Sequence, residues 1–92
     1  MKGGAIVADV LSELGCKIIF GNPGIHNMEI YDRLFQRKDI KHLLVKHEAN
    51  AAIMADVYGR LTGEPGICLT TAGPGATNCV TALAQAYSAA SP

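Results

Sequence analysis

The sequence predicts an α/β fold in which a parallel β-sheet packs against helices. Short apolar runs, typical of buried strands, alternate with longer segments whose apolar residues recur at helical spacing. Turn signals rich in glycine and proline separate these segments. Hydrophobic residues make up 49% of the chain but aromatic residues only 5%, which favours a closely packed aliphatic core rich in alanine. The predicted order is αβαβαβα, and this alternation implies right-handed crossovers.

Four segments show the apolar periodicity of helices. The first three helices are expected at residues 4–14, 28–37 and about 48–62. Gly15 is placed to end the first of them, and Asn27 is placed to cap the second. The fourth helix follows a tight loop, and its predicted apolar face consists of Val80, Leu83, Ala84 and Tyr87.

Three short apolar segments are the predicted strands, at residues 17–20, 40–45 and 67–71. The second run leads directly into Glu48 and an alanine-rich helix, so we interpret it as a buried strand. In parallel α/β proteins, ligands bind at the carboxyl ends of the strands. We therefore expect three loops to converge there, at residues 21–24, 46–48 and 72–75.

Composition excludes several classes of function. The chain has eight acidic and eight basic residues, so it lacks the basic surface that nucleic-acid binding needs. No apolar run approaches the roughly 18 residues of a membrane helix, and no signal peptide is evident. The three cysteines lack metal-binding spacing, and we expect no metal site. Small buried cysteines suit a reducing, cytoplasmic setting.

Glu48 is the candidate catalytic residue. Acidic residues also favour the first turn of a helix for purely structural reasons, and that alternative stays open. Burial after a strand would raise the pKa of this carboxyl, whereas the helix dipole would lower it. A carboxyl balanced between these two effects can share a proton with a bound base.

The segment at residues 73–78 (GPGATN) partly matches a dinucleotide-binding glycine motif. Asn78 replaces the third glycine, so that fingerprint fails. One interpretation is a tight strand-to-helix turn. The other is a backbone surface that a flat ligand can approach closely, with Asn78 as a polar contact.

Four motifs, in this order and spacing, resemble the N-terminal pyrimidine-binding domain of thiamine-diphosphate-dependent enzymes. They are residues 20–24 (FGNPG), 47–52 (HEANAA), 58–63 (YGRLTG) and 71–78 (TAGPGATN). The most similar branch is the acetolactate synthase family, and pyruvate oxidase, benzoylformate decarboxylase and oxalyl-CoA decarboxylase are relatives. The resemblance covers residues 1–92 as one truncated domain. It implies a three-layer α/β/α thiamine-diphosphate-binding fold, of which about half is present, with strand order 2-1-3.

The resemblance also implies site residues. Glu48 matches the glutamate that hydrogen-bonds the pyrimidine nitrogen of thiamine diphosphate, so that the imino group of the cofactor can remove the thiazolium C2 proton. Pro23 and Gly24 match the turn beside the pyrimidine, and Gly75 and Asn78 match its second wall. In the family the diphosphate and Mg²⁺ are bound by a C-terminal domain with a GDG…NN motif, which is absent here.

The expected function is that of an N-terminal fragment of an acetolactate synthase-like enzyme, the isolated chain being inactive. Such an enzyme decarboxylates a 2-oxo acid such as pyruvate and transfers the acyl-anion equivalent to a carbonyl acceptor, as in branched-chain amino acid biosynthesis. The family implies a homodimer or tetramer. Alternatives are a decarboxylase or oxidase on the same scaffold, a non-catalytic assembly or regulatory module, and a structural domain without cofactor. The acceptor and any flavin stay open.

Overall fold

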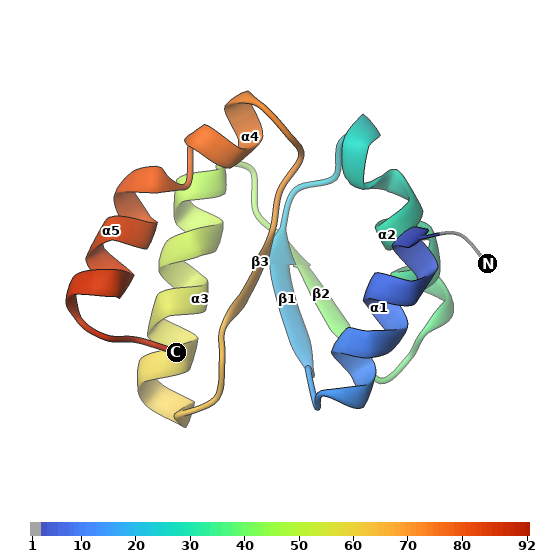
Figure 1. Ribbon diagram of the computed structural model, residues 1–92, viewed down its shortest axis with the longest axis horizontal. Coiled ribbons are helices and arrows are strands. Elements are labelled where there is room, and N and C mark those ends of the chain that lie inside the picture. Colours follow the sequence, from blue (N-terminus) through green and yellow to red (C-terminus); the bar gives the residue numbers. More distant parts are fainter. Residues whose placement is uncertain (1–2) are drawn as a thin grey trace.

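The computed structural model describes residues 3–92, and its elements follow the predicted alternation (Figure 1). In chain order they are α1 (Gly3–Glu13), β1 (Ile18–Gly21), the 3-10 helix η1 (Ile25–Asn27), α2 (Met28–Gln36), β2 (Lys41–Leu44), α3 (Glu48–Thr62), β3 (Ile67–Leu69), α4 (Pro74–Thr77) and α5 (Val80–Ser88). Strands β2 and β3 are shorter than the sequence suggests, because only these residues pair in the sheet, whereas β1 has the predicted length and begins one residue later.

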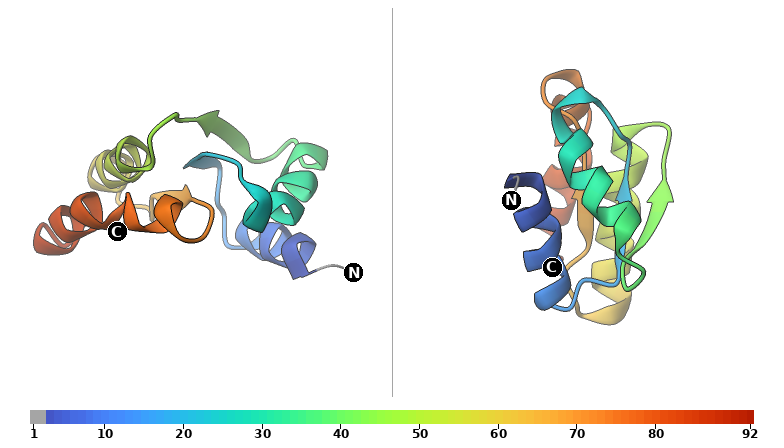
Figure 2. Two further views of the ribbon diagram at one scale, coloured as in Figure 1. Left: turned by 90° about the horizontal axis from the view of Figure 1, so that it is seen from above. Right: turned by 90° about the vertical axis from the view of Figure 1, so that its right-hand side faces the viewer.

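The three strands form one parallel sheet in the order β2-β1-β3, which confirms the predicted topology. Phe20 of β1 lies opposite Leu43 of β2 and Cys68 of β3. Helices α1 and α2 cover one face of the sheet, and α3 and α5 cover the other (Figures 1 and 2). The three-layer α/β/α prediction is therefore confirmed.

The core lies on both faces of the central strand β1. Successive residues of a strand point to opposite faces. Ile19 accordingly packs against α1 and α2, in a cluster with Ala8 and Leu34. Phe20 packs against Ala51 and Ala55 of α3 and the neighbouring side chains. Alanine at these helix positions lets the backbone of α3 approach the sheet closely, as the composition suggested.

The second strand is not the buried strand that the sequence predicted. Leu43 is 39% exposed and Leu44 is 60% exposed, whereas Ile40 and Val45 on either side of β2 are buried. The reason is position, since β2 lies at the edge of the sheet and its outer side has no neighbouring strand among the described residues. An apolar run in the sequence indicates a strand, but it does not show whether that strand lies in the middle of the sheet or at its edge.

The predicted fourth helix is divided into α4 and α5. Its expected apolar face is turned outward: Val80 and Leu83 are more than half exposed, and Tyr87 is 88% exposed. The contact with α3 is made instead by Ala82, which packs with Ala52 and Cys79. The helical periodicity of the sequence identified a stripe of large apolar residues as the buried face of this helix. In the structure the small residues Cys79 and Ala82 pack against α3 instead.

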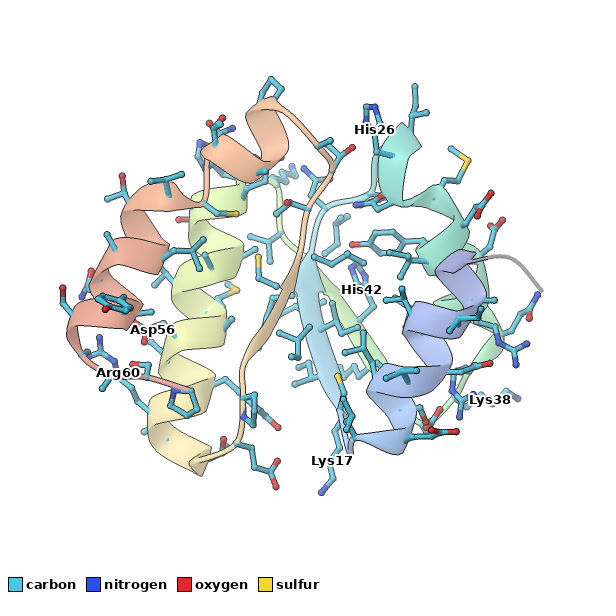
Figure 3. All side chains as sticks on the ribbon, in the orientation of Figure 1. Lys17, His26, Lys38, His42, Asp56 and Arg60 are labelled. Carbon is cyan, nitrogen blue, oxygen red and sulfur yellow. The ribbon has the colours of Figure 1, made fainter. Side chains whose placement is uncertain are left out.

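The motif at residues 58–63 has a structural explanation in this fold. Asp56 is buried and accepts two hydrogen bonds from Arg60, each of 3.0 Å, so the charge of the arginine is paired (both residues are labelled in Figure 3). Gly63 has a φ of 74° at the C-cap of α3. This left-handed conformation suits glycine. Within this motif, Arg60 is therefore explained by its pairing with Asp56, and Gly63 by its place at the end of α3.

None of the three cysteines is in a disulfide. Cys79 is buried, and Cys16 and Cys68 are half-buried. Burial raises the pKa of the Cys68 thiol to about 12. A thiol in that state is protonated at neutral pH and reacts slowly. Cys68 and Cys79 act here as small apolar core residues, in line with the expectation from their spacing.

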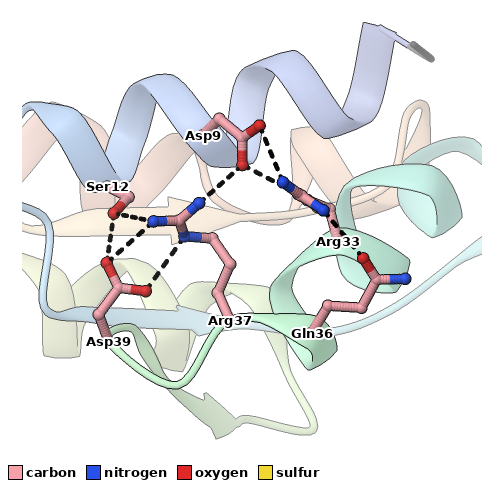
Figure 4. Close-up of polar contacts among 6 residues, drawn as sticks. All are labelled: Asp9, Ser12, Arg33, Gln36, Arg37 and Asp39. Carbon is pink, nitrogen blue, oxygen red and sulfur yellow. Dashed lines mark hydrogen bonds and ion pairs between the residues drawn. The ribbon is translucent and has the colours of Figure 1, made fainter.

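A charge cluster ties α1 to the end of α2 (Figure 4). Asp9 accepts hydrogen bonds from Arg33 Nε and Arg37 Nη1, each of 2.9 Å. Arg37 also donates to Asp39 and to Ser12, and Ser12 donates to Asp39. The cluster joins α1 to the end of α2 and the turn that follows it, across sequence separations of 24 to 28 residues.

Acid should weaken this cluster. The hydrogen bond from Arg33 is the main reason that the pKa of Asp9 lies below its ordinary value of 3.8. Asp9 therefore adds stability above pH 3.8, and that stability is lost as the pH falls through the lower folded-state pKa. We expect Asp9→Asn to lower the melting temperature at pH 7 and to reduce the difference between pH 7 and pH 3, measured by circular dichroism. The exposed control Asp32→Asn should keep the wild-type difference, and equal curves for both variants would contradict the assignment.

Candidate functional site

The segments that follow β1, β2 and β3 meet at the carboxyl edge of the sheet, as predicted. Each pair of segments is joined by one side-chain hydrogen bond. The three bonds are Asn22 Nδ2 to the Lys46 carbonyl oxygen (3.3 Å), His26 Nδ1 with Thr71 Oγ1 (3.1 Å), and Asn78 Nδ2 to Glu48 Oε1 (3.1 Å). We call these segments, residues 22–27, 46–48 and 71–78, the loop cluster.

Asn27 organises the first segment of the loop cluster. It stands at the N-cap of α2, but its side chain does not cap that helix, so the predicted role is wrong. Its Oδ1 accepts a hydrogen bond of 2.8 Å from the Gly24 N–H, and its Nδ2 donates to the Asn22 carbonyl oxygen. The residue is only 3% exposed. Asn27 therefore fixes the shape of the loop that carries Pro23 and Gly24.

Thr71 is wedged between two of the predicted cofactor-binding glycines. A Cβ atom on Gly24 would lie 2.6 Å from Thr71 Cβ, and one on Gly75 would lie 2.8 Å from Thr71 Cγ2. Both positions therefore need glycine for the loops to approach this closely. On Gly75 the same Cβ would also lie 3.5 Å from Glu48 Oε2. Glycine here leaves open the space beside the carboxylate.

Glu48 begins α3, directly after its N-cap His47. Its pKa is lowered, first by a hydrogen bond from its own backbone N–H and then by the amide of Asn78. Burial raises the pKa, but this is a weaker effect than the two hydrogen bonds. The expected balance between burial and dipole is therefore wrong for this structure, in which the carboxylate form is favoured.

The Glu48–Asn78 contact can be tested by titration. In Asn78→Asp a second carboxylate would stand where the amide donates, and two adjacent carboxylates resist ionising together. We expect the pKa of Glu48 to rise clearly, as measured by NMR of the side-chain carboxyl carbon. Asn50→Asp is the matched control, since residues two apart on a helix do not face each other. A similar small shift in both variants would show that the contact with Asn78 does not set this pKa.

Four of the five predicted site residues share these contacts: Glu48 bonds Asn78, and Gly24 and Gly75 flank Thr71. Pro23 instead lines an open groove of about 320 Å³ along α2, with side chains such as Met28 and Phe35. Sequence reasoning missed Thr71 and His26 as parts of the site. A hydroxyl at the end of the third apolar run, and a histidine two residues after a GNPG turn, were the available signals.

Comparison with known proteins identifies the family of this chain. The model of the family described as "Thiamine pyrophosphate enzyme, N-terminal TPP binding domain" matches residues 1–92. The chain belongs to this family. The predicted resemblance is thus confirmed, and thiamine diphosphate is the cofactor of the family.

Relatives with different named activities match this chain. It is 50% identical over 90 residues to an acetolactate synthase of Arthrospira platensis, covering 95% of this chain and 16% of that protein. It is 47% identical to a probable acetolactate synthase large subunit of Methanocaldococcus jannaschii, covering 100% and 15%. A probable 2-ketoarginine decarboxylase of Pseudomonas aeruginosa is 41% identical, covering 95% and 15%. The chain thus spans about a sixth of the length of these relatives.

Two absences concern the described part of the chain alone. Between residues 3 and 92, no helix has the length and apolar character needed to cross a membrane. Over the same residues, histidine, cysteine and acidic side chains form no group of three or more that could hold a metal ion.

Proposed function

We propose that the loop cluster binds the aminopyrimidine ring of thiamine diphosphate, with Glu48 as the residue that exchanges a proton with it. The observation that carries this proposal is the placement of the Glu48 carboxylate. Its Oε1 is held by Asn78, while its Oε2 faces the space that Gly75 leaves open. We infer that a flat ring approaches Glu48 over Gly75, where no side chain stands in the way, so that a ring nitrogen would meet Oε2.

The lowered pKa of Glu48 fits this role. In the structure the carboxyl is half-exposed and ionised. A ring bound beside Oε2 would displace water from the carboxylate, and desolvation raises a carboxyl pKa. Glu48 would then hold a proton between Oε2 and the ring nitrogen, which is the condition for efficient proton transfer. When bound, the cofactor would supply a thiazolium ring that serves as the electron sink for decarboxylation.

We further propose that this domain belongs to a longer enzyme resembling acetolactate synthase. That enzyme would decarboxylate a 2-oxo acid such as pyruvate and transfer the acyl-anion equivalent to a carbonyl acceptor, a reaction of branched-chain amino acid biosynthesis. The acetolactate synthase relatives, at up to 50% identity, support this reading. A 2-oxo acid decarboxylase is the second candidate, favoured by the 41% identity to the probable 2-ketoarginine decarboxylase.

The products distinguish the two candidates. With pyruvate, thiamine diphosphate and Mg²⁺, the enzyme carrying this domain should form acetolactate if it transfers the acyl group. A decarboxylase would release acetaldehyde instead. Consumption of neither pyruvate nor a longer 2-oxo acid by an enzyme with bound cofactor would overturn the proposed reaction class.

The diphosphate and Mg²⁺ should be bound outside this chain. The loop cluster offers hydrogen bonds and space for the pyrimidine, but charge-assisted bonds to the diphosphate would have to come from elsewhere. We therefore expect the 92-residue chain to be inactive and to bind thiamine diphosphate with Mg²⁺ only weakly or not at all by calorimetry. Micromolar binding by the isolated chain would show that it contains a phosphate site.

We propose that the domain works in a homodimer or tetramer, through the interface that the family forms between pyrimidine-binding and diphosphate-binding domains. Support comes from the outward faces of α3 and α5, which carry exposed apolar side chains. These are Ile53, Met54, Val57 and Leu61 on α3, and Val80, Leu83 and Tyr87 on α5. Extended apolar surface of this kind is typical of association sites.

A further inference from the structure

We propose that His26 binds the substrate: its Nε2 donates a hydrogen bond to the carboxylate of the 2-oxo acid, and Thr71 holds the ring in position. This inference rests on the proposed function and deepens it, since it names a residue that would recognise the anionic part of the substrate. Neither residue is among those that the family resemblance assigns to the cofactor.

The first observation is where His26 lies. It is exposed in η1, at the same end of the molecule as the β3–α4 loop, and Figure 3 labels it there. Its Nδ1 is 3.1 Å from Thr71 Oγ1. Thr71 in turn lies against Gly75, which borders Glu48 Oε2. A continuous series of contacts therefore joins His26 to the proposed catalytic carboxylate, across the segments that follow β1 and β3.

The second observation is which ring nitrogen remains free to bind. Thr71 engages Nδ1, and among the described residues no hydrogen bond is made by Nε2. The roles in this contact depend on the tautomer of the ring. The proposal takes the tautomer in which the threonine hydroxyl donates to Nδ1, so that the ring proton lies on Nε2. Nε2 is then a donor that points away from its anchor, which is what a carboxylate requires.

The third observation is that the amide side chains of the loop cluster and its other histidine are already engaged. Asn22 donates to the Lys46 carbonyl oxygen, and the Asn78 amide donates to Glu48. His47 accepts a hydrogen bond from the Ala49 N–H at its own helix start. His26 is the histidine that a side chain from a different loop holds in place. A bound anion next to Glu48 needs such a donor to offset the repulsion between two carboxylates.

The test compares three variants of the full enzyme: His26→Ala, His26→Gln and Thr71→Val. We expect His26→Ala to raise the KM for pyruvate about tenfold, the usual size for one hydrogen bond to a charged group. The kcat and the affinity for thiamine diphosphate should change less than twofold. His26→Gln keeps a donor and should recover part of the loss. Thr71→Val keeps the wedge between the glycines but loses the hydroxyl, and should raise KM by a smaller factor.

Methyl pyruvate serves as the neutral probe, because it keeps the 2-oxo group of pyruvate and carries a methyl ester in place of the negative charge. Its inhibition constant should be the same in wild type and His26→Ala. An unchanged KM for pyruvate in His26→Ala, or an equal loss for pyruvate and methyl pyruvate, would overturn the role of His26 alone. A wild-type enzyme that binds no thiamine diphosphate would overturn the proposed function, and this inference with it.

Discussion

Replacing Glu48 with glutamine is expected to lower the kcat of the enzyme that carries this domain by about 10²–10⁴-fold. Glutamine keeps the size of the side chain and its position at the start of α3, so the fold should change little. It cannot exchange a proton with a ring nitrogen, and positioned proton transfer accounts for rate factors of this size. Steady-state turnover with saturating cofactor measures the effect.

Glu29→Gln is the matched control for this experiment. Glu29 is also an acidic residue in the first turn of a helix, in this case α2, and it is exposed. The two substitutions therefore each remove one negative charge from the first turn of a helix. Turnover in Glu29→Gln should stay within about twofold of wild type. An equal loss of turnover in both variants would show that Glu48 acts only as a stabilising charge in the first turn of its helix.

Gly66→Ala is expected to prevent cooperative folding of the chain. A Cβ at this position would lie 1.9 Å from the carbonyl oxygen of Ala55 and 2.6 Å from its carbonyl carbon. These are backbone atoms of α3 and cannot rotate away, so β3 and α3 would have to separate. Overpacking typically costs about 1–3 kcal/mol. A backbone collision belongs at the upper end of that range, and a domain this small has only a few kcal/mol to lose.

Urea unfolding followed by circular dichroism tests the Gly66 prediction. The control is Gly3→Ala at the start of α1, where nothing lies within 4 Å of the added Cβ. Alanine also favours a helix over glycine, so this variant should be as stable as wild type or slightly more stable. A Gly66→Ala chain with the wild-type midpoint would contradict the close packing of α3 against the start of β3.

The alternation of strands and helices could be predicted because it depends on local patterns. Ile19 and Phe20 belong to a short apolar run flanked by turn signals, and both are buried, one on each face of β1. The convergence of the three loops could also be predicted from the sequence, since parallel strands bring their carboxyl ends to one edge of the sheet. The position of Glu48 directly after an apolar run made it the candidate catalytic residue, and the family resemblance added the strand order and a cofactor-binding role for this carboxylate.

Features that depend on neighbouring elements could not be predicted. Leu44 resembles a core residue in the sequence and is exposed because β2 is an edge strand. Asn27 resembles a helix cap, but its side chain bonds within the loop. The pairing of His26 with Thr71 joins residues 45 positions apart, so no local pattern could show it. The lowered pKa of Glu48 likewise arises partly from Asn78, which lies 30 positions away.

Hydrogen–deuterium exchange at C2 of thiamine diphosphate bound to the full enzyme measures the proton transfer that we assign to Glu48. We predict rapid exchange in wild type and an exchange rate lower by about 10²–10⁴-fold in Glu48→Gln, with cofactor binding and the fold preserved. Exchange at the wild-type rate in a folded, cofactor-loaded Glu48→Gln enzyme would contradict the assignment of Glu48 as the proton-exchanging residue.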